Sequence, residues 1–273
     1  MKFCYDIPKK LKLKYPVILA HGIACRDHTE EERKTAWGRI PESLREKGVD
    51  VYFGDSDGWA SIEDNALKLK RTVNKILKKT GKNKVNIIAH SKGGLDARYM
   101  ISELDMEDKV ASLTTINTPH EGVKLVDFMI KYIPKPIYRF ISNMIDKIAT
   151  KKGDENSNCM QCSFDLSHSY CEEFNKKIKD SKKVYYQSFS TFREKKNPGK
   201  YFIPRFVLHF IDKDKNDGIV SYRSAHWKNF IFWPQFKNFD HDNLVDHGSF
   251  ARKNQGVLLL YANLIMILIT KSL

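Results

Sequence analysis

Short apolar runs alternate with segments of helical periodicity through the first 116 residues of the chain. Each run is too short for a buried helix and is rich in β-branched residues, so each one predicts a buried strand. Between 61 and 79 the apolar residues recur at helical spacing, with Ser61 and Asp64 as a capping pair and Gly81 as the stop. The predicted strands are 15–20, 49–53, 85–89 and 110–116, and the predicted helices are 37–47, 61–79 and 93–104.

This alternation favours an α/β fold with a mostly parallel central sheet flanked by helices. Helices cover both faces of a parallel sheet, which explains why these strands are continuous apolar runs rather than alternating patterns. Further strands are predicted at 184–189 and 206–211, and the apolar run 257–270 predicts a buried terminal helix because it is too short to cross a bilayer comfortably.

The regular pattern is broken between the fourth and fifth predicted strands. Residues 125–148 are rich in apolar side chains and interrupted by two prolines, and residues 151–163 are polar and rich in turn-forming residues. An insertion of this kind predicts a cap over the carboxyl edge of the sheet. We therefore predict a single domain over 1–273, with a helical lid or cap inserted at about 120–175.

Charge narrows the classes of partner. Lys and Arg number 47 against 33 Asp and Glu, a net charge of +14. The basic residues are scattered and no nucleic-acid motif accompanies them, so we expect no nucleic-acid partner. A basic surface also attracts anionic lipid, although a general abundance of lysine explains the charge equally well. The first 17 residues contain no apolar leader, which predicts a cytoplasmic protein; the alternative is a secreted protein whose signal is missing from this sequence.

Five cysteines leave at least one thiol without an intramolecular disulfide partner. Cys159 and Cys162 form a C-x-x-C pair, with His168 and Cys171 close behind. These residue types can bind zinc, but no second close-spaced pair supports such a site. The pattern favours free thiols in a reducing setting over a metal centre.

The strongest local motif is VNIIAHSKGG at 85–94, in which a strand leads into a turn and then a helix. Small residues stand two positions before and two after Ser91, at Ala89 and Gly93. This is the spacing of the nucleophile elbow of α/β-hydrolases, where a strained serine needs close packing of strand and helix around it. Alanine replaces the first glycine of the usual motif. Ser91 is therefore predicted to be a nucleophile, with a helix N-cap serine as the alternative.

Two backbone amides are predicted to bind a developing oxyanion. The first is Lys92 N–H, which follows the nucleophile at the start of the next helix. The second comes from the loop after an early strand in this fold, and His21-Gly22-Ile23 directly follows the first predicted strand. Ile23 N–H is the predicted donor, while His21 is expected only to shape the loop.

A serine nucleophile needs a histidine base and a carboxylate that orients it, in the chain order Ser, acid, His. His241 and His247 both lie in the loop FDHDNLVDH before the last helix, where the base belongs, and both remain open on this reasoning. Asp217 lies in the turn NDG and is the predicted acid. Asp212 and Asp214 are its alternatives, although both read as solvated loop residues.

These segments together resemble the bacterial triacylglycerol lipases of the α/β-hydrolase superfamily. The blocks YPVILAHGI, VNIIAHSKGGLDARYM, VASLTTINTP, FDLSHSYCEEFN and NDGIVS follow the order of that family's motifs. The resemblance implies Ser91 as nucleophile, Asp217 as acid and His241, which stands in an H-x-D-like context, as base. His247 is the alternative base.

The resemblance further implies hydrolysis of carboxylic esters of lipids through an acyl-enzyme, with transient contact between the lid and a lipid interface. Alternatives are a short-chain esterase, an acyltransferase, or a non-catalytic lipid-binding protein on the same fold. The family often binds a structural calcium ion beside the histidine. Its ligand falls on Asn243, with Asp242 shifted by one position, so the charge is lower than calcium prefers. No cofactor is expected for the chemistry itself.

Overall fold

The centre of the fold is a six-stranded sheet in the order β2-β1-β3-β4-β5-β6, with every neighbouring pair parallel. The computed structural model describes residues 2–194, 207–208, 210–247 and 255–273. The strands are β1 (Val17–Ala20), β2 (Val51–Phe53), β3 (Val85–His90), β4 (Val110–Ile116), β5 (Tyr185–Phe189) and β6 (Phe230–Ile231). The predicted mostly parallel α/β sheet is confirmed.

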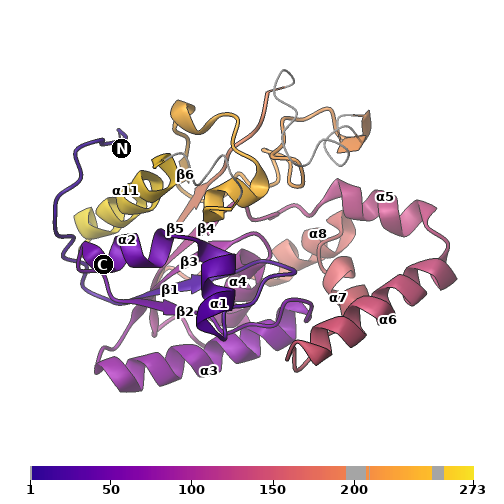
Figure 1. The fold of residues 1–273 in the computed structure, drawn as a ribbon, viewed down its shortest axis with the longest axis horizontal. Helices are drawn as coiled ribbons and strands as arrows, with labels where there is room; N and C mark the ends of the chain where they lie inside the picture. The colour runs from indigo at the N-terminus through magenta and orange to yellow at the C-terminus, as the bar shows by residue number, and fades with distance from the viewer. Residues whose placement is uncertain (1, 195–206, 209, 248–254) are drawn as a thin grey trace.

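Helices cover both faces of this sheet, as Figure 1 shows with α2 and α11 on one side and α3 on the other. Alternate strand residues divide between the two layers: Val17 and Leu19 of β1 pack with α2 and α11, whereas Ile18 and Ala20 pack with α3 and α4. The helices are α1 (Glu30–Trp37), α2 (Ile40–Glu46), α3 (Ile62–Thr80), α4 (Gly93–Glu103), α5 (Lys124–Tyr132), α6 (Lys135–Lys151), α7 (Cys159–Phe164), α8 (His168–Lys177) and α11 (Gly256–Thr270), with 3-10 turns η1 (Pro234–Phe236) and η2 (His241–Val245).

Two predicted elements are wrong. The helix expected at 37–47 is interrupted at Gly38, whose φ of +52° ends α1 and lets the chain restart as α2. The strand expected at 206–211 is not a strand, because its described residues 207, 208, 210 and 211 are helical, while 206 and 209 lie outside the described residues. A short apolar run does not distinguish a strand from a buried helical turn by periodicity. The last strand of the sheet is instead β6.

The terminal helix α11 is buried along most of its length, as predicted. Its one strongly polar buried side chain, Asn263, does not interrupt the packing, because it binds the N-terminal segment. Asn263 Oδ1 accepts from Cys4 N–H at 2.8 Å, and its Nδ2 donates to the Cys4 carbonyl at 2.8 Å. Among the described residues no helix is both long and apolar enough to cross a membrane. The cytoplasmic location stays a prediction.

The insertion between β4 and β5 contains α5, α6, α7 and α8. In Figure 1, α7 and α8 lie between the sheet and the outer pair α5 and α6. No residue of α5 is buried, and only Ser142 and Ala149 of α6 are. The role of this segment as a lid stays a prediction, but most apolar side chains of α5 and α6 are exposed, whereas Cys171 and Phe174 of α8 are buried.

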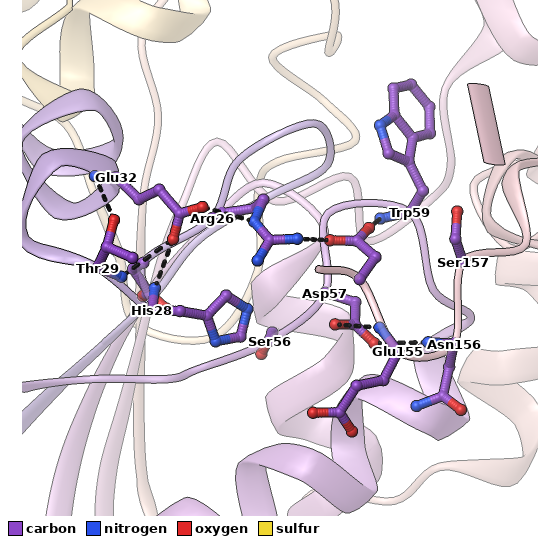
Figure 2. Close-up of polar contacts among 12 residues, drawn as sticks. Arg26, His28, Thr29, Glu32, Ser56, Asp57, Trp59, Glu155, Asn156 and Ser157 are labelled. Carbon is purple, nitrogen blue, oxygen red and sulfur yellow. Dashed lines mark hydrogen bonds and ion pairs between the residues drawn. The ribbon is translucent and has the colours of Figure 1, made fainter. Parts of the chain in front are cut away.

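Polar contacts attach the segment that follows α6 to the loops that follow β1 and β2 (Figure 2). The buried carboxylate of Asp57 accepts the backbone N–H groups of Glu155 and Asn156 at 3.2 and 3.0 Å, and Lys68 Nζ donates to it at 2.8 Å. Asp154 Oδ1 accepts a hydrogen bond from Arg26 Nη1 at 2.7 Å. Since a buried carboxylate must be paired, these contacts define where the insertion returns to the core.

Replacement of Asn263 by alanine is expected to release the N-terminal segment from α11. Two backbone groups of Cys4 would lose their partners, which predicts a loss of about 1–3 kcal/mol in the free energy of unfolding. Urea unfolding measures the loss, and limited proteolysis would show earlier cleavage near residue 4. Asn143→Ala, at an exposed position of α6, is the matched control and should stay within about 0.5 kcal/mol of the parent. Equal unfolding midpoints for the two variants would contradict this role.

Candidate active site

Ser91 lies at a sharp turn between β3 and α4 with a φ of +54°. This left-handed conformation costs a non-glycine residue of the order of 1–3 kcal/mol, so surrounding contacts must maintain it. Ser91 N–H donates to the Ile116 carbonyl at 2.9 Å, and Thr118 Oγ1 donates to the Ser91 carbonyl at 2.8 Å. Both partners follow the end of β4 or belong to it, so the neighbouring strand holds the strained serine.

Glycines allow three backbone segments to meet at Ser91. A Cβ on Gly22 would lie 2.6 Å from Ser91 Cβ and 3.2 Å from its Oγ, a distance that a real side chain does not tolerate at Cβ. A Cβ on Gly93 would collide with the carbonyl oxygens of Ala20 and His21. The second small position of the motif is therefore required by contact with the end of β1, as well as by the packing within the elbow that the sequence suggested.

Asp217 and His241 form a buried hydrogen-bonded pair. His241 Nδ1–H donates to Asp217 Oδ2 at 2.6 Å, and His241 N–H donates to the Asp217 carbonyl at 3.0 Å. The other carboxylate oxygen of Asp217 accepts the N–H groups of Ile219 and Val220 at 2.9 and 2.8 Å. The carboxylate therefore fixes the imidazole with its proton on Nδ1 and leaves Nε2 able to accept a proton.

Two opposing influences act on the charge of His241. Burial disfavours the imidazolium, but the charge and hydrogen bond of Asp217 favour it, and the net result is a pKa raised above the usual 6.5. The imidazolium that forms when a base takes a proton is thus stabilised in place.

His90, the last residue of β3, connects the strand that precedes Ser91 to the histidine loop, and the sequence reasoning did not identify it. Its ring lies 4.6 Å from that of His241, and its Nε2–H donates to the His241 carbonyl at 3.1 Å. Burial, together with the nearby His241, holds the pKa of His90 well below its usual value, so it acts as a neutral donor. Within the described residues no hydrogen bond joins Ser91 Oγ to His241, a contact that is often long until substrate binds.

The alternative acids and base have other contacts. Asp212 pairs with Lys124 at 2.7 Å, and Asp214 accepts the backbone N–H groups of Lys215 and Arg223. The backbone of His247 bonds to Asp242 and Asn243 within its own loop, whereas the Asp217 side chain bonds to His241. The geometry therefore favours Asp217 and His241, and their catalytic roles stay a prediction.

The Ile23 and Lys92 amides are both available as donors. In the described part of the chain neither N–H makes a hydrogen bond to the protein. His21 Nδ1 lies 2.8 Å from the Gly22 carbonyl, and its Nε2 lies 3.2 Å from the Ser56 carbonyl. Because C=O and N–H of a trans peptide point in opposite directions, holding the Gly22 carbonyl turns the Ile23 N–H away from His21. His21 is therefore placed to shape this loop through its contacts with the Gly22 and Ser56 carbonyls.

The Lys92 side chain forms a buried ion pair that its role as an amide donor did not suggest. Its Nζ donates to Asp96 Oδ1 at 2.7 Å, and Asn65 Nδ2 donates to the other oxygen at 3.3 Å. Burial raises the pKa of Asp96 to about 6, against the opposing effect of the Lys92 ammonium. The pair lies within the first turn of α4, and we interpret it as a clamp on the backbone that carries the Lys92 amide.

Ionic and polar contacts hold the histidine loop on the core. Arg39 donates to both oxygens of the buried Asp246, at 2.8 Å from Nε and 2.7 Å from Nη2, and its backbone N–H adds a third bond at 2.8 Å. Tyr261 of α11 donates its hydroxyl to the Leu244 carbonyl at 3.0 Å. The loop is therefore attached to both α2 and α11.

Asn243, one of the two residues proposed for calcium, has its side-chain amide engaged within its own loop. Asn243 Oδ1 accepts the Asp240 N–H at 2.9 Å, and its Nδ2 donates to the His247 carbonyl at 3.0 Å. The amide is thus occupied by the loop that a calcium ion would stabilise. No group of three or more His, Cys, Asp or Glu side chains suited to a metal occurs among the described residues. A structural calcium ion stays an untested expectation for this loop.

The cysteine cluster also lacks the arrangement of a zinc site. Cys159, Cys162 and Cys171 are buried free thiols, whereas His168 is exposed and its Nδ1 contacts the Glu121 carbonyl at 2.7 Å. Burial raises the pKa of Cys162 and of Cys171 to about 12, which keeps both protonated. The assignment of these cysteines as free thiols in a reducing setting stays a prediction.

The parallel sheet, the flanking helices and the strained serine after β3 define an α/β-hydrolase fold. The crystal structure of Staphylococcus hyicus lipase shares this fold, with a TM-score of 0.73 at 17% identity over 99% of this chain and 100% of that one. A family model described as palmitoyl protein thioesterase matches residues 16–197, more than half of the chain. The chain belongs to the palmitoyl protein thioesterase family.

Curated relatives confirm the resemblance to triacylglycerol lipases. Triacylglycerol lipase 2 of Saccharomyces cerevisiae is 29% identical over 216 residues, covering 77% of this chain and 62% of that protein. A triacylglycerol lipase of Pseudarthrobacter phenanthrenivorans is 38% identical over 119 residues, covering 42% of this chain and 36% of that protein. The chain thus spans less than two thirds of the length of these relatives.

The raised pKa of His241 predicts the pH dependence of the nucleophile. Below that pKa His241 is protonated and does not accept the Ser91 proton, so reaction is lost as pH falls through a midpoint above 6.5. In Asp217→Asn the stabilising charge is gone, and the residual rate should be lost at a lower pH. The rate of Ser91 labelling by a fluorophosphonate, measured against pH, gives both midpoints. A parent midpoint below 6.5, or one unchanged in the variant, would argue against the pairing.

Asp246→Asn is expected to loosen the histidine loop without altering its chemistry. Asparagine tolerates the φ of +63° at this position but does not form the charge-assisted pair with Arg39, so unfolding should become easier by about 1–2 kcal/mol. The labelling rate of Ser91 should fall while its pH midpoint stays constant. Glu42→Gln, which removes an exposed pair with Arg45, is the control and should change neither quantity. A shifted midpoint in Asp246→Asn would assign this residue a different role.

Proposed function

We propose that this chain is a serine hydrolase that cleaves carboxylic esters of lipids through a Ser-His-Asp acyl-enzyme mechanism. The observation that carries the proposal is the strained elbow serine, Ser91, beside the buried hydrogen-bonded pair of Asp217 and His241. The lipase names of the relatives support the ester class.

In the proposed reaction Ser91 Oγ attacks the ester carbonyl while His241 Nε2 takes the hydroxyl proton. Asp217 stays ionised and stabilises the imidazolium through the 2.6 Å hydrogen bond. When the tetrahedral intermediate collapses, the C–O bond to the leaving alcohol breaks and His241 returns the proton to that alcohol. Water then attacks the acyl-enzyme with His241 again as base, which releases the fatty acid and restores Ser91.

Negative charge on the carbonyl oxygen is proposed to be met by the Ile23 and Lys92 amides. Preorganised donors in a buried site stabilise a transition state strongly, because they need no reorganisation as charge develops. His21 and the Lys92–Asp96 pair are proposed to hold these two amides in position. Both are buried polar contacts next to Ser91 in the chain or in space.

A long acyl chain is proposed because the insertion exposes apolar side chains from two helices. Movement of such helices at a lipid surface would supply an apolar path for the chain. The family description also favours a second substrate class, acyl thioesters, since a thiol is a better leaving group than an alcohol and the same acyl-enzyme serves both. Oxygen esters are favoured as substrates because the relatives are triacylglycerol lipases.

Ser91→Ala is expected to abolish labelling by a fluorophosphonate and to lower ester hydrolysis about 10⁴-fold or more. Ser102→Ala, near the other end of α4, is the control and should retain both. Peptide mapping of the labelled parent identifies the modified serine. A folded parent that takes no label at Ser91 would make the chain a non-catalytic lipid-binding protein, which is the alternative from another class.

Substrate range is measured in the same system. A series of nitrophenyl esters from short to long acyl chains, with and without an emulsion, separates a lipase from a short-chain esterase. A matched pair of palmitoyl oxygen ester and palmitoyl thioester compares the two leaving groups. Faster reaction of short esters with no effect of the emulsion would exclude the long-chain proposal, and release of transfer products in the presence of an alcohol would indicate an acyltransferase.

A further inference from the structure

The outer helices of the insertion carry many exposed apolar side chains that no other described element covers. Phe140 of α6 is 67% exposed and Tyr132 of α5 is 60% exposed, although the interior of a protein is the usual place for such side chains. Exposed apolar side chains gathered on two consecutive helices mark a contact with another molecule or phase. The exposed apolar side chains of the pair are Phe128, Met129, Ile130, Tyr132, Ile137, Phe140, Ile141, Met144 and Ile148.

The apolar residues of α6 recur at i, i+3, i+4, i+7 and i+11, counted from Ile137. This spacing puts them in one stripe along the helix. The buried Ser142 and Ala149 fall on a different face, which is directed toward α7. The same helix therefore has one narrow side that packs on the protein and one apolar side that is exposed. Figure 1 shows α6 on the outside of the insertion.

Unpaired positive charge accompanies the apolar stripe. Residues 124–152 contain seven basic and two acidic residues, a net charge of +5 within the +14 of the chain. Lys124 pairs with Asp212. The remaining six basic side chains are exposed and form no ion pair with any described residue; they are Lys131, Lys135, Arg139, Lys147, Lys151 and Lys152.

The two acidic residues of this segment serve internal contacts. Asp127 accepts the His168 N–H at 2.9 Å, and Asp146 accepts the Ser157 hydroxyl and the Cys159 N–H, both at 2.7 Å. Neither carboxylate neutralises the cations of the outer surface. The surface therefore combines exposed apolar side chains with an excess of free positive charge, which is the pattern of helices that lie in the interface of an anionic bilayer.

We propose that α5 and α6 are a docking surface for an anionic phospholipid bilayer. The apolar side chains enter the boundary between headgroups and acyl chains, while the six cations bind lipid phosphates and carboxylates. This proposal rests on the proposed hydrolysis of lipid esters only for its biological purpose, because the surface exists whether or not Ser91 reacts. The proposal specifies that the lipid surface which the enzyme is expected to use is negatively charged.

Charge also decides between this partner and two others. In a symmetric dimer the same patch faces itself, and six unpaired cations on each copy would repel each other across the contact. A neutral oil surface would satisfy the apolar side chains but leave the cations without partners. Only an anionic surface complements both features at once.

Binding is tested with the full chain carrying Ser91→Ala, so that turnover does not consume the lipid. Cosedimentation is measured with phosphatidylcholine vesicles and with vesicles of phosphatidylcholine and phosphatidylserine. We expect the mixed vesicles to be preferred, with an affinity that falls as salt is raised, because each exposed cation near an anionic surface contributes about fivefold. The double variant Lys131→Gln and Arg139→Gln should bind mixed vesicles roughly 10–30-fold more weakly.

The matched control is Lys9→Gln with Lys12→Gln, which removes the same charge from an exposed segment away from the insertion and should leave binding almost unchanged. Phe140→Asn with Met144→Asn should weaken binding to both kinds of vesicle while leaving the preference for the anionic kind. Circular dichroism and urea unfolding confirm that each variant folds, and the exposed positions make folding defects small.

Equal binding to both kinds of vesicle, or equal loss in the two charge variants, would overturn the proposal. A vesicle-independent dimer that Phe140→Asn dissociates would also overturn it in favour of a second copy. Fluorophosphonate labelling of the parent is scored separately. Anionic binding without labelling would leave the docking surface standing and remove the proposed hydrolysis, whereas labelling without anionic preference would do the reverse.

Discussion

The left-handed backbone of Ser91 is the constraint that organises the centre of the molecule. A non-glycine residue stays at a φ of +54° only where its neighbours offset the strain. Here the offset comes from β4 through Ile116 and Thr118, and from the end of β1, where Gly22 and Gly93 permit contact. The three strands involved are adjacent in the sheet, so the sheet order is itself part of the elbow. A serine held in this way needs parallel strands, whose carboxyl ends meet at one edge.

Buried charge around the site is balanced by the protein itself. Asp217 is met by His241 and two amides, Asp57 by Lys68 and two amides, and Asp246 by Arg39. A buried carboxylate without such partners would be destabilising, and each of these carboxylates joins segments far apart in the sequence. The positive charge that attaches the histidine loop to α2 comes from the guanidinium of Arg39, which binds Asp246. The Asn243 side chain closes the loop on itself through hydrogen bonds with Asp240 and His247.

Sequence reasoning succeeded where a local pattern has one structural solution. The strand before Ser91, the capped start of α3 at Ser61 and the buried terminal helix are of this kind, because periodicity and capping chemistry act within a few residues. It failed at 206–211, where apolar side chains suit a helical turn as well as a strand. Contacts such as His90 with His241 join positions 151 residues apart, and no local signal announces them. The acid and base themselves could be ordered along the chain, but the pairing of Asp217 with His241 rather than His247 is a tertiary fact.

The insertion is held on the protein by a different mix of apolar and polar contacts from that of the sheet. Its outer helices bury almost no apolar side chain, so their attachment depends on polar contacts at the base, including Asp57 with the Glu155 and Asn156 amides and Asp154 with Arg26. A segment held by few apolar contacts opens at lower free energy than the core. The polar base keeps the return of the chain in register with the loop after β2, while the apolar stripe stays outside. The free energy that would have fixed α5 and α6 on the protein is therefore available for contact with a lipid surface. Apolar side chains thus pack on both faces of the sheet that carries Ser91, whereas most of those on α5 and α6 are left exposed.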